Sequence, residues 1–181
     1  MTITFEPANA HRDRDLLLDL NIQYVQWLEQ CIRRDFDLEL AHLLGGSIPE
    51  YVASALDKLC AAHPPEGVFY IVRRNGQPAG MGGVRRLPDG ASEMKRVFVL
   101  PDQRGGGLGG VIVKQLIADS DAFGYATMRL DTGPFMASAH RLYEAEGFRD
   151  RHAYAGAEVP VELRHNWRFM ERSRGAVYPV G

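Results

Sequence analysis

The residues best suited to chemistry in this chain form a glycine-rich loop. An apolar run ending at Val99 is followed by Arg104 and by glycines at 105, 106, 107, 109 and 110. Glycine lets backbone N–H groups approach a ligand closely, and the N-terminus of the helix that the loop opens adds about half a positive charge. Arginine adds a permanent charge and a planar fork that suits phosphate. Because the first turn of this helix holds no acidic residue, the pattern predicts a phosphate-binding loop.

Two kinds of phosphate ligand fit the loop differently. Gly105-x-Gly107-x-x-Gly110 matches the dinucleotide fingerprint, and Asp131 lies about twenty residues further on, where a ribose-binding acid belongs. In dinucleotide-binding folds, however, the glycines follow directly after the strand, whereas five residues separate Val99 from Gly105 here. The upstream strands are also predicted to be antiparallel, and too little chain follows for a doubly wound sheet. A nicotinamide-dinucleotide-binding oxidoreductase is therefore the weaker alternative.

Two motifs together resemble a known family. Arg104-x-x-Gly107-x-Gly109, directly after the strand that ends Val97-Phe98-Val99, resembles the signature loop of the GNAT superfamily of acetyl-coenzyme A-dependent N-acetyltransferases. The segment Ala139-His140-Arg141-Leu142-Tyr143-Glu144-Ala145-Glu146-Gly147-Phe148 is similar to the family's A-x-x-L-Y-x-x-x-G-F element. Both motifs occur at the family's usual separation, and the predicted element order also fits.

The resemblance implies that acetyl-CoA is the co-substrate. No metal is expected, because the histidines are scattered without the spacing of metal ligands. The resemblance assigns the pantetheine arm and thioester to the main chain of Val97, Phe98 and Val99. It assigns the pyrophosphate to the loop residues Arg104, Gly105, Gly106, Gly107, Leu108, Gly109 and Gly110. Many family members bind the cofactor arm with an asparagine where this chain has Met136, so Ser138 is expected to supply a hydroxyl contact instead.

Acetyl transfer to an amine needs a neutral amine and a proton for the leaving thiolate. Tyr143 matches the family's tyrosine near the sulfur and is the candidate general acid, although a core aromatic is the alternative. Glu93, on the central strand, is the candidate base, with a solvated strand-end carboxylate as the alternative. Asp131 is a second candidate base, or it caps the turn that follows it. Water alone remains a third possibility for the base.

Periodicity and turn signals predict the elements that position these residues. In chain order they are a strand over 2–6, helices over 11–31 and from Ser47 to before Pro64, strands over 68–72, 78–86 and 93–100, a helix over 108–123, a strand over 127–130, a helix over 135–146, and strands from 148 and over 167–171. The resulting fold class is α/β (α+β mixed), a GNAT-like single domain over 2–171 with a C-terminal tail over 172–181. The resemblance implies a mostly antiparallel central sheet with one parallel, splayed strand pair, flanked by about four helices.

Composition excludes several other classes. The 181 residues are 45% hydrophobic and carry a formal net charge of −2, so disorder is excluded and nothing predicts a nucleic-acid partner. No apolar run approaches the ~18 residues that span a bilayer, so no membrane partner is expected. Cys31 and Cys60 and the scattered histidines lack metal-ligand spacing. A cytoplasmic location is expected, and the resemblance suggests a homodimer.

The predicted function is transfer of an acetyl group from acetyl-CoA to a primary amine of a small molecule or amino-acid derivative, by direct attack in a ternary complex. A non-catalytic acyl-CoA-binding sensor is the alternative from another class. The acceptor pocket is expected between the first two helices, the loop over 33–46 and the segment over 152–160. Four aromatic residues are candidates for its lining: Tyr24, Trp27, Phe36 and Tyr154.

Overall fold

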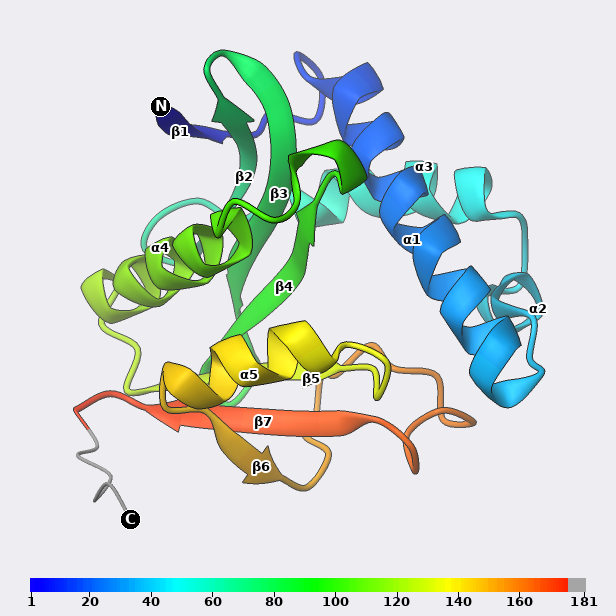
Figure 1. Cartoon of the computed structure of the whole chain (residues 1–181). Helices are drawn as coiled ribbons and strands as arrows, with labels where there is room; N and C mark the ends of the chain where they lie inside the picture. The colour runs from blue at the N-terminus through cyan, green and yellow to red at the C-terminus, as the bar shows by residue number, and fades with distance from the viewer. Residues whose placement is uncertain (176–181) are drawn as a thin grey trace.

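The computed structural model describes residues 1–175 and consists of one seven-stranded sheet with helices on both faces (Figure 1). The strands are β1 (Ile3–Pro7), β2 (Gly67–Arg74), β3 (Gln77–Arg86), β4 (Ser92–Val99), β5 (Thr127–Thr132), β6 (Arg149–Arg151) and β7 (Arg168–Ser173). The helices are α1 (Arg14–Phe36), α2 (Leu40–Leu44), α3 (Ile48–Leu59), α4 (Leu108–Ala122) and α5 (Ala137–Ala145), with a 3₁₀ turn over Pro101–Gln103.

The strand order is β1-β2-β3-β4-β5-β7-β6, and every neighbouring pair is antiparallel except β4 and β5. These two parallel strands pair only at Ser92–Met128 and Glu93–Arg129. Beyond Glu93 they diverge, and a wedge-shaped gap opens at the centre of the sheet. The predicted fold class, including the splayed parallel pair, is confirmed.

Local sequence signals explain how several elements begin and end. Ser47, where this helix is predicted to begin, forms a capping box with Glu50 at the start of α3. Asn75 and Gly76 both adopt positive φ in the predicted turn of the β2–β3 hairpin. Helix α1 continues beyond its predicted end at 31 because Ile32 extends its buried face.

The helices divide into two layers, each with its own apolar cluster. Helices α1 and α3 pack against one face of the sheet, and α4 and α5 against the other (Figure 1). On β4, Phe98 faces α1, where its ring centroid lies 5.7 Å from that of Tyr24. Val97 and Val99 pack into the cluster on the α4 side. The strand therefore contributes side chains to both layers beside the gap.

A bulge in β4 lies next to the divergence. Met81 pairs with Phe98 and Gly83 with Lys95, so Arg96 and Val97 together oppose Gly82 alone. Arg96 has a φ of +51°, which is the left-handed region and costs energy for a residue with a side chain. The bulge redirects the Arg96 side chain toward α1 and α3, where its guanidinium bonds Asn21 and Tyr51.

Helix α5 packs against the sheet through only part of its apolar side. Ala139 and Tyr143 pack into the cluster on the α4 side, whereas Leu142 is 36% exposed. Leu142 points instead toward the start of α4, where a Cβ on Gly110 would lie 3.5 Å from its Cδ2 atom. At the chain end, β7 reaches Ser173, and residues 176–181 of the expected tail lie outside the described part.

Candidate active site

A groove lies where β4 and β5 diverge, roofed by the start of α4 and by α5. We call it the loop groove; its volume is about 560 Å³. It is lined by Trp27, Val97, Phe98, Val99, Arg104, Gly105, Gly107, Leu108, Gly109, Gly110, Val113, Phe135, Met136, Ala137, Ser138, Ala139, Leu142 and Tyr143. The structure thus brings together Tyr143 and every predicted cofactor-binding residue except Gly106.

The loop presents backbone donors to this groove. Gly105 and Gly107 have φ values of +83° and +73°, in the left-handed region that favours glycine. Gly107 is the N-cap of α4, so no side chain caps the helix, and its first turn holds no acidic residue. The helix N-terminus is therefore left with donors and partial positive charge available to an anion.

Arg104 is fixed at the mouth of the groove. Its Nε donates to the carbonyl oxygen of Val99 at 3.1 Å. Its guanidinium carbon lies 5.9 Å from the Trp27 ring centroid and 5.7 Å from that of Phe98. Two aromatic faces and a backbone acceptor thus orient an exposed cation beside the loop.

Sequence analysis missed a second cation, Arg74, which lies behind the loop. Its Nη1 donates to the Gln103 carbonyl oxygen at 3.1 Å, while its Nε and Nη2 are buried and bond no protein acceptor. A Cβ on Gly106 would come within 3.1 Å of Nη2, so Gly106 packs on Arg74 rather than lining the groove. The sequence showed Arg74 only as the residue before a hairpin turn, with no signal linking it to the loop.

Tyr143 is buried against the floor of the groove. Its exposed fraction is 7%, and its ring meets Phe148 edge-on at a centroid distance of 5.9 Å. Burial raises the pKa of the Tyr143 hydroxyl well above its usual range, and the nearby Tyr24 and Asp131 raise it further. The phenol is therefore neutral at physiological pH and retains a proton to donate.

Glu93 is not a solvated strand-end carboxylate, and that alternative was wrong. The residue is 0% exposed. Its Oε2 accepts from Arg85 Nε at 2.6 Å and its Oε1 from the Tyr154 hydroxyl at 2.7 Å. Glu93 lines neither the loop groove nor the two cavities described below. Both oxygens instead join β3 and β4 to the segment that follows β6.

Asp131, the second candidate base, lies at the end of β5. Its Oδ1 accepts from the indole N–H of Trp167, the residue just before β7, at 3.1 Å. The carboxylate is therefore bonded to a neighbouring segment rather than to the backbone of the turn that follows it. The Asp131 carboxylate raises the pKa of both Tyr24 and Tyr143, which places its charge within electrostatic reach of the two phenols.

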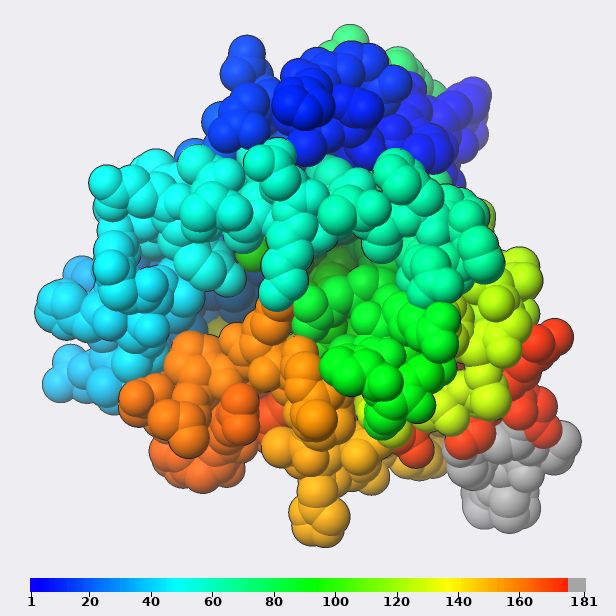
Figure 2. Space-filling view, turned by 180° about the vertical axis from the view of Figure 1, so that it is seen from behind, coloured from blue at the N-terminus to red at the C-terminus, as the bar shows by residue number. Residues whose placement is uncertain are grey.

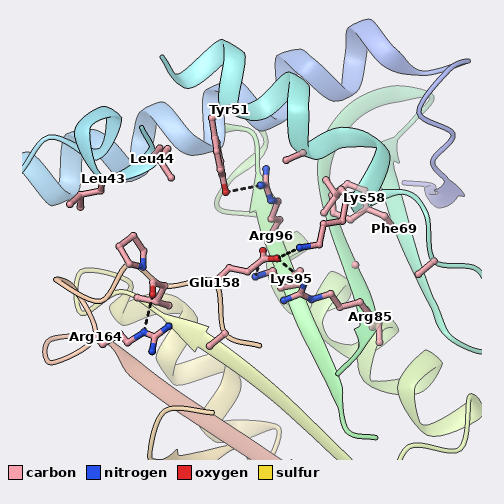
Figure 3. Close-up of a pocket in the computed structure, with 18 of the residues that line it drawn as sticks. Leu43, Leu44, Tyr51, Lys58, Phe69, Arg85, Lys95, Arg96, Glu158 and Arg164 are labelled. Carbon is pink, nitrogen blue, oxygen red and sulfur yellow. Dashed lines mark hydrogen bonds and ion pairs between the residues drawn. The ribbon is translucent and has the colours of Figure 1, made fainter. Parts of the chain in front are cut away.

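Two further cavities lie on the α1/α3 side of the sheet. The larger, which we call the cationic cavity, has a volume of about 630 Å³ and opens between α3 and the segment over 157–164 (Figures 2 and 3). Its charged lining residues are Lys58, Arg85, Lys95, Arg96, Glu158, Glu162 and Arg164.

The smaller, the bridging cavity, has a volume of about 110 Å³ and shares Tyr51, Lys95, Arg96 and Glu158 with the cationic cavity. Tyr24, Asp131 and Trp167 also line it.

The segments expected to form the acceptor pocket therefore line the cationic and bridging cavities, but the four aromatic residues expected to line one pocket do not lie together. Tyr24 lines the bridging cavity and Trp27 the loop groove. Phe36 lines none of the three, and Tyr154 is bound to Glu93. Trp27 and Trp167 both meet Phe135 edge-on, at 5.8 and 5.7 Å. This aromatic row joins the wall of the loop groove to that of the bridging cavity.

Within residues 1–175, no group of three or more His, Cys, Asp or Glu side chains is arranged to hold a metal ion. Over the same residues, no helix has the length and apolar content needed to cross a bilayer.

Comparisons with known proteins agree with this geometry. The model of the acetyltransferase (GNAT) family matches residues 25–148. The chain is 37% identical over 100 residues to an uncharacterized N-acetyltransferase, C1271.07c, of Schizosaccharomyces pombe, a match that covers 54% of this chain and 61% of that protein. It is 33% identical over 114 residues to the IAA acetyltransferase of Azospirillum brasilense, covering 62% and 74%.

A solved structure has the same fold. The PaiA N-acetyltransferase from Thermoplasma acidophilum in complex with coenzyme A gives a TM-score of 0.68 at 12% identity, covering 96% of this chain and 99% of that one. The family model accounts for more than half of the sequence. The chain belongs to the GNAT acetyltransferase family.

Proposed function

We propose that the protein is an acetyl-CoA-dependent N-acetyltransferase that acetylates a primary amine of a small molecule. The observation that carries the proposal is the loop groove, in which an uncapped helix N-terminus, a fixed arginine and a buried tyrosine line one gap in the sheet. The family membership and a related fold solved with coenzyme A support the same ligand.

In this proposal the pyrophosphate binds the N–H groups of residues 105–110, with Arg104 on its outer side and the charge of Arg74 behind it. The pantetheine arm lies along β4 at Val97–Val99, where the edge of the strand that faces the gap no longer pairs with β5. Ser138, exposed at the start of α5, contacts the cofactor near its phosphates.

The proposed chemistry uses two groups, Tyr143 in the loop groove and Asp131 in the bridging cavity. An ammonium acceptor gives a proton to Asp131, and the neutral amine attacks the thioester carbonyl carbon. As the carbon–sulfur bond breaks, the Tyr143 hydroxyl protonates the departing sulfur, and the proton lost by the new amide nitrogen replaces the one that Tyr143 gave. A phenol is a weaker acid than a thiol of pKa about 8.5, so this donation is concerted with bond cleavage.

Asp131 suits the role of base better than Glu93. Asp131 lines the bridging cavity beside Tyr24 and interacts electrostatically with Tyr143. Glu93 lines none of the three cavities, and its two oxygens accept from Arg85 and Tyr154, so it acts in this proposal as a structural carboxylate.

Replacement of Tyr143 by Phe tests the proposal. We expect turnover, measured by release of the CoA thiol with a panel of amines, to fall by about 10²- to 10⁴-fold. CoA affinity, measured by calorimetry, should stay within a few-fold because the ring remains. If the variant loses CoA binding too, Tyr143 is structural. If the wild-type protein binds acetyl-CoA and acetylates no amine, the chain is an acyl-CoA-binding sensor. Light scattering would test whether the protein is also a homodimer.

A further inference from the structure

Arg96 is held in place by neutral side chains and forms no salt bridge with a described carboxylate. It leaves the sheet from the β4 bulge, and its Nη1 donates to Asn21 Oδ1 at 2.6 Å. Its Nη2 lies 3.5 Å from the Tyr51 hydroxyl oxygen, and its guanidinium carbon is 5.9 Å from that ring's centroid. These partners are neutral, and within residues 1–175 no carboxylate lies within 4.0 Å of the guanidinium nitrogens. Its charge is oriented but not compensated.

The other cations of the cationic cavity are mostly neutralised (Figure 3). Lys58, Arg85 and Lys95 all pair with Glu158, at distances between 2.8 and 3.3 Å. Arg85 also pairs with the buried Glu93. Arg164 resembles Arg96, because its Nε donates to the Val159 carbonyl oxygen at 3.0 Å and no described carboxylate pairs with it. Among the cations of the cavity, Arg96 and Arg164 are therefore the two without a described carboxylate partner.

Arg96 and Asp131 both line the bridging cavity, as does the ion pair of Lys95 and Glu158. Beside that pair, the small space therefore holds one cation and one carboxylate, Arg96 and Asp131, that form no salt bridge with a described residue. Its volume of about 110 Å³ equals that of roughly four water molecules at about 30 Å³ each. An amine and a carboxylate joined by one carbon fit this volume and this charge pattern. Asp131 also lies within electrostatic reach of Tyr143, so the amine would be at the reacting end.

We infer that the acceptor is an amino acid, whose ammonium is drawn to Asp131 and whose carboxylate binds the guanidinium of Arg96. The rest of the acceptor extends into the cationic cavity, where Leu44, Leu59 and Val68 offer an apolar wall and Arg164 adds a second positive charge. This inference rests on the proposed function and specifies its substrate class. Arg96 is then the residue that selects acceptors by charge.

Matched acceptors test the inference directly. With saturating acetyl-CoA, thiol release is measured for L-leucine against L-leucinamide and for L-phenylalanine against L-phenylalaninamide. The amine of each amide is more often neutral at the same pH, so intrinsic reactivity favours the amides. We expect kcat/KM to be at least 10-fold higher for the free acids, since a charge-assisted bidentate contact is lost in the amides. Equal or higher kcat/KM for the amides would overturn the inference.

Variants separate charge selection from a structural role. Arg96→Gln should reduce the acid-to-amide preference by about 10- to 100-fold, mainly through a higher KM for the acids. Arg164→Gln, on the segment outside the sheet, should reduce the preference by a smaller factor, and it serves if Arg96→Gln fails to fold. Arg86→Gln is the control, because Arg86 pairs with Glu66 and lines none of the three cavities. An unchanged preference in both cavity variants would contradict the assignment.

Two further readouts keep this test distinct from that of the proposed function. If calorimetry detects no acetyl-CoA binding, the proposed function fails before acceptor choice is reached. If CoA binds but neither pair turns over, thermal shifts with N-acetyl-L-leucine and N-acetyl-L-leucinamide are compared in the presence of CoA. A larger shift with the acid supports the inference, and equal or absent shifts overturn it.

Discussion

Arg74 is a buried cation whose hydrogen-bonding groups the fold satisfies only in part. Two of its guanidinium nitrogens are buried without a protein acceptor, which costs folding free energy. Its Nη1 supports Gln103, just before the glycine loop, and its positive charge is permanent. An anion on the other side of the loop would benefit from that charge in a setting with little screening by water.

Replacement of Arg74 by Met should therefore separate the two effects. We expect CoA affinity, measured by calorimetry, to fall by about 3- to 10-fold, while the melting temperature of the ligand-free protein stays the same or rises. Arg73→Met is the matched control, since Arg73 pairs with Glu6 away from the loop and its loss should leave CoA affinity unchanged. Unaltered CoA affinity in the Arg74 variant would mean that this arginine does not serve the loop.

The ion pairs of Glu158 should make the stability of the protein depend on pH. Burial alone would raise the pKa of the Glu158 carboxyl group, but Lys95, Lys58 and Arg85 lower it to about 2, from an ordinary value of about 4.3. A lowered pKa in the folded state stabilises the protein above the ordinary pKa, and this contribution is lost as the pH falls from about 4.3 to 2.

Glu158→Gln should thus lower the free energy of unfolding at pH 7 by about 1 kcal/mol, a reduced value because the side chain is 36% exposed and water screens the pairs. Urea unfolding at pH 7 and pH 3 should show the difference shrinking at the lower pH. Glu162→Gln, an exposed carboxylate on the same segment, should show no such trend. A pH-independent difference for Glu158→Gln would contradict the ion-pair explanation.

Among the elements, β3 and β4 must approach closely to hold the edge of the groove. A Cβ on Gly80 would lie 2.4 Å from the Phe98 carbonyl oxygen, a backbone atom that cannot move without shifting β4. Gly80→Ala should therefore destabilise the protein by about 1 to 3 kcal/mol in chemical unfolding. Gly110→Ala, whose Cβ would meet Leu142 at 3.5 Å in a helix, should be neutral or stabilising. Similar effects of the two substitutions on the free energy of unfolding would show that the close approach of β3 and β4 does not exclude a side chain at position 80.

How far the elements could be predicted depends on whether their signals are local. The Asn75-Gly76 turn, the Ser47–Glu50 capping box and the glycine loop each carry their signal within a few residues, and the structure contains all three. The burial of Glu93 depends on Tyr154, which is 61 residues away, and Arg74 meets the loop from 29 residues away. No periodicity or turn signal connects such pairs, so they emerge only when the sheet is assembled.

For the whole molecule, β4 contributes lining residues to cavities on both faces of the sheet, beside the point where it diverges from β5. The loop groove collects groups suited to a phosphorylated cofactor, and the bridging and cationic cavities collect charges suited to a small acceptor. Tyr143 and Asp131 lie where the two sides meet. The proposed function therefore depends on which ligand binds in the loop groove.

The most direct test is a thermal shift of the purified protein with acetyl-CoA, CoA, NAD and NADP in parallel. A ligand at one hundred times its Kd stabilises the folded state by about 2.7 kcal/mol, which is a shift of several degrees for a domain of this size. We predict that acetyl-CoA and CoA raise the melting temperature and that the nicotinamide dinucleotides do not. A shift with NAD or NADP alone would contradict the account and favour the dinucleotide fingerprint in the loop.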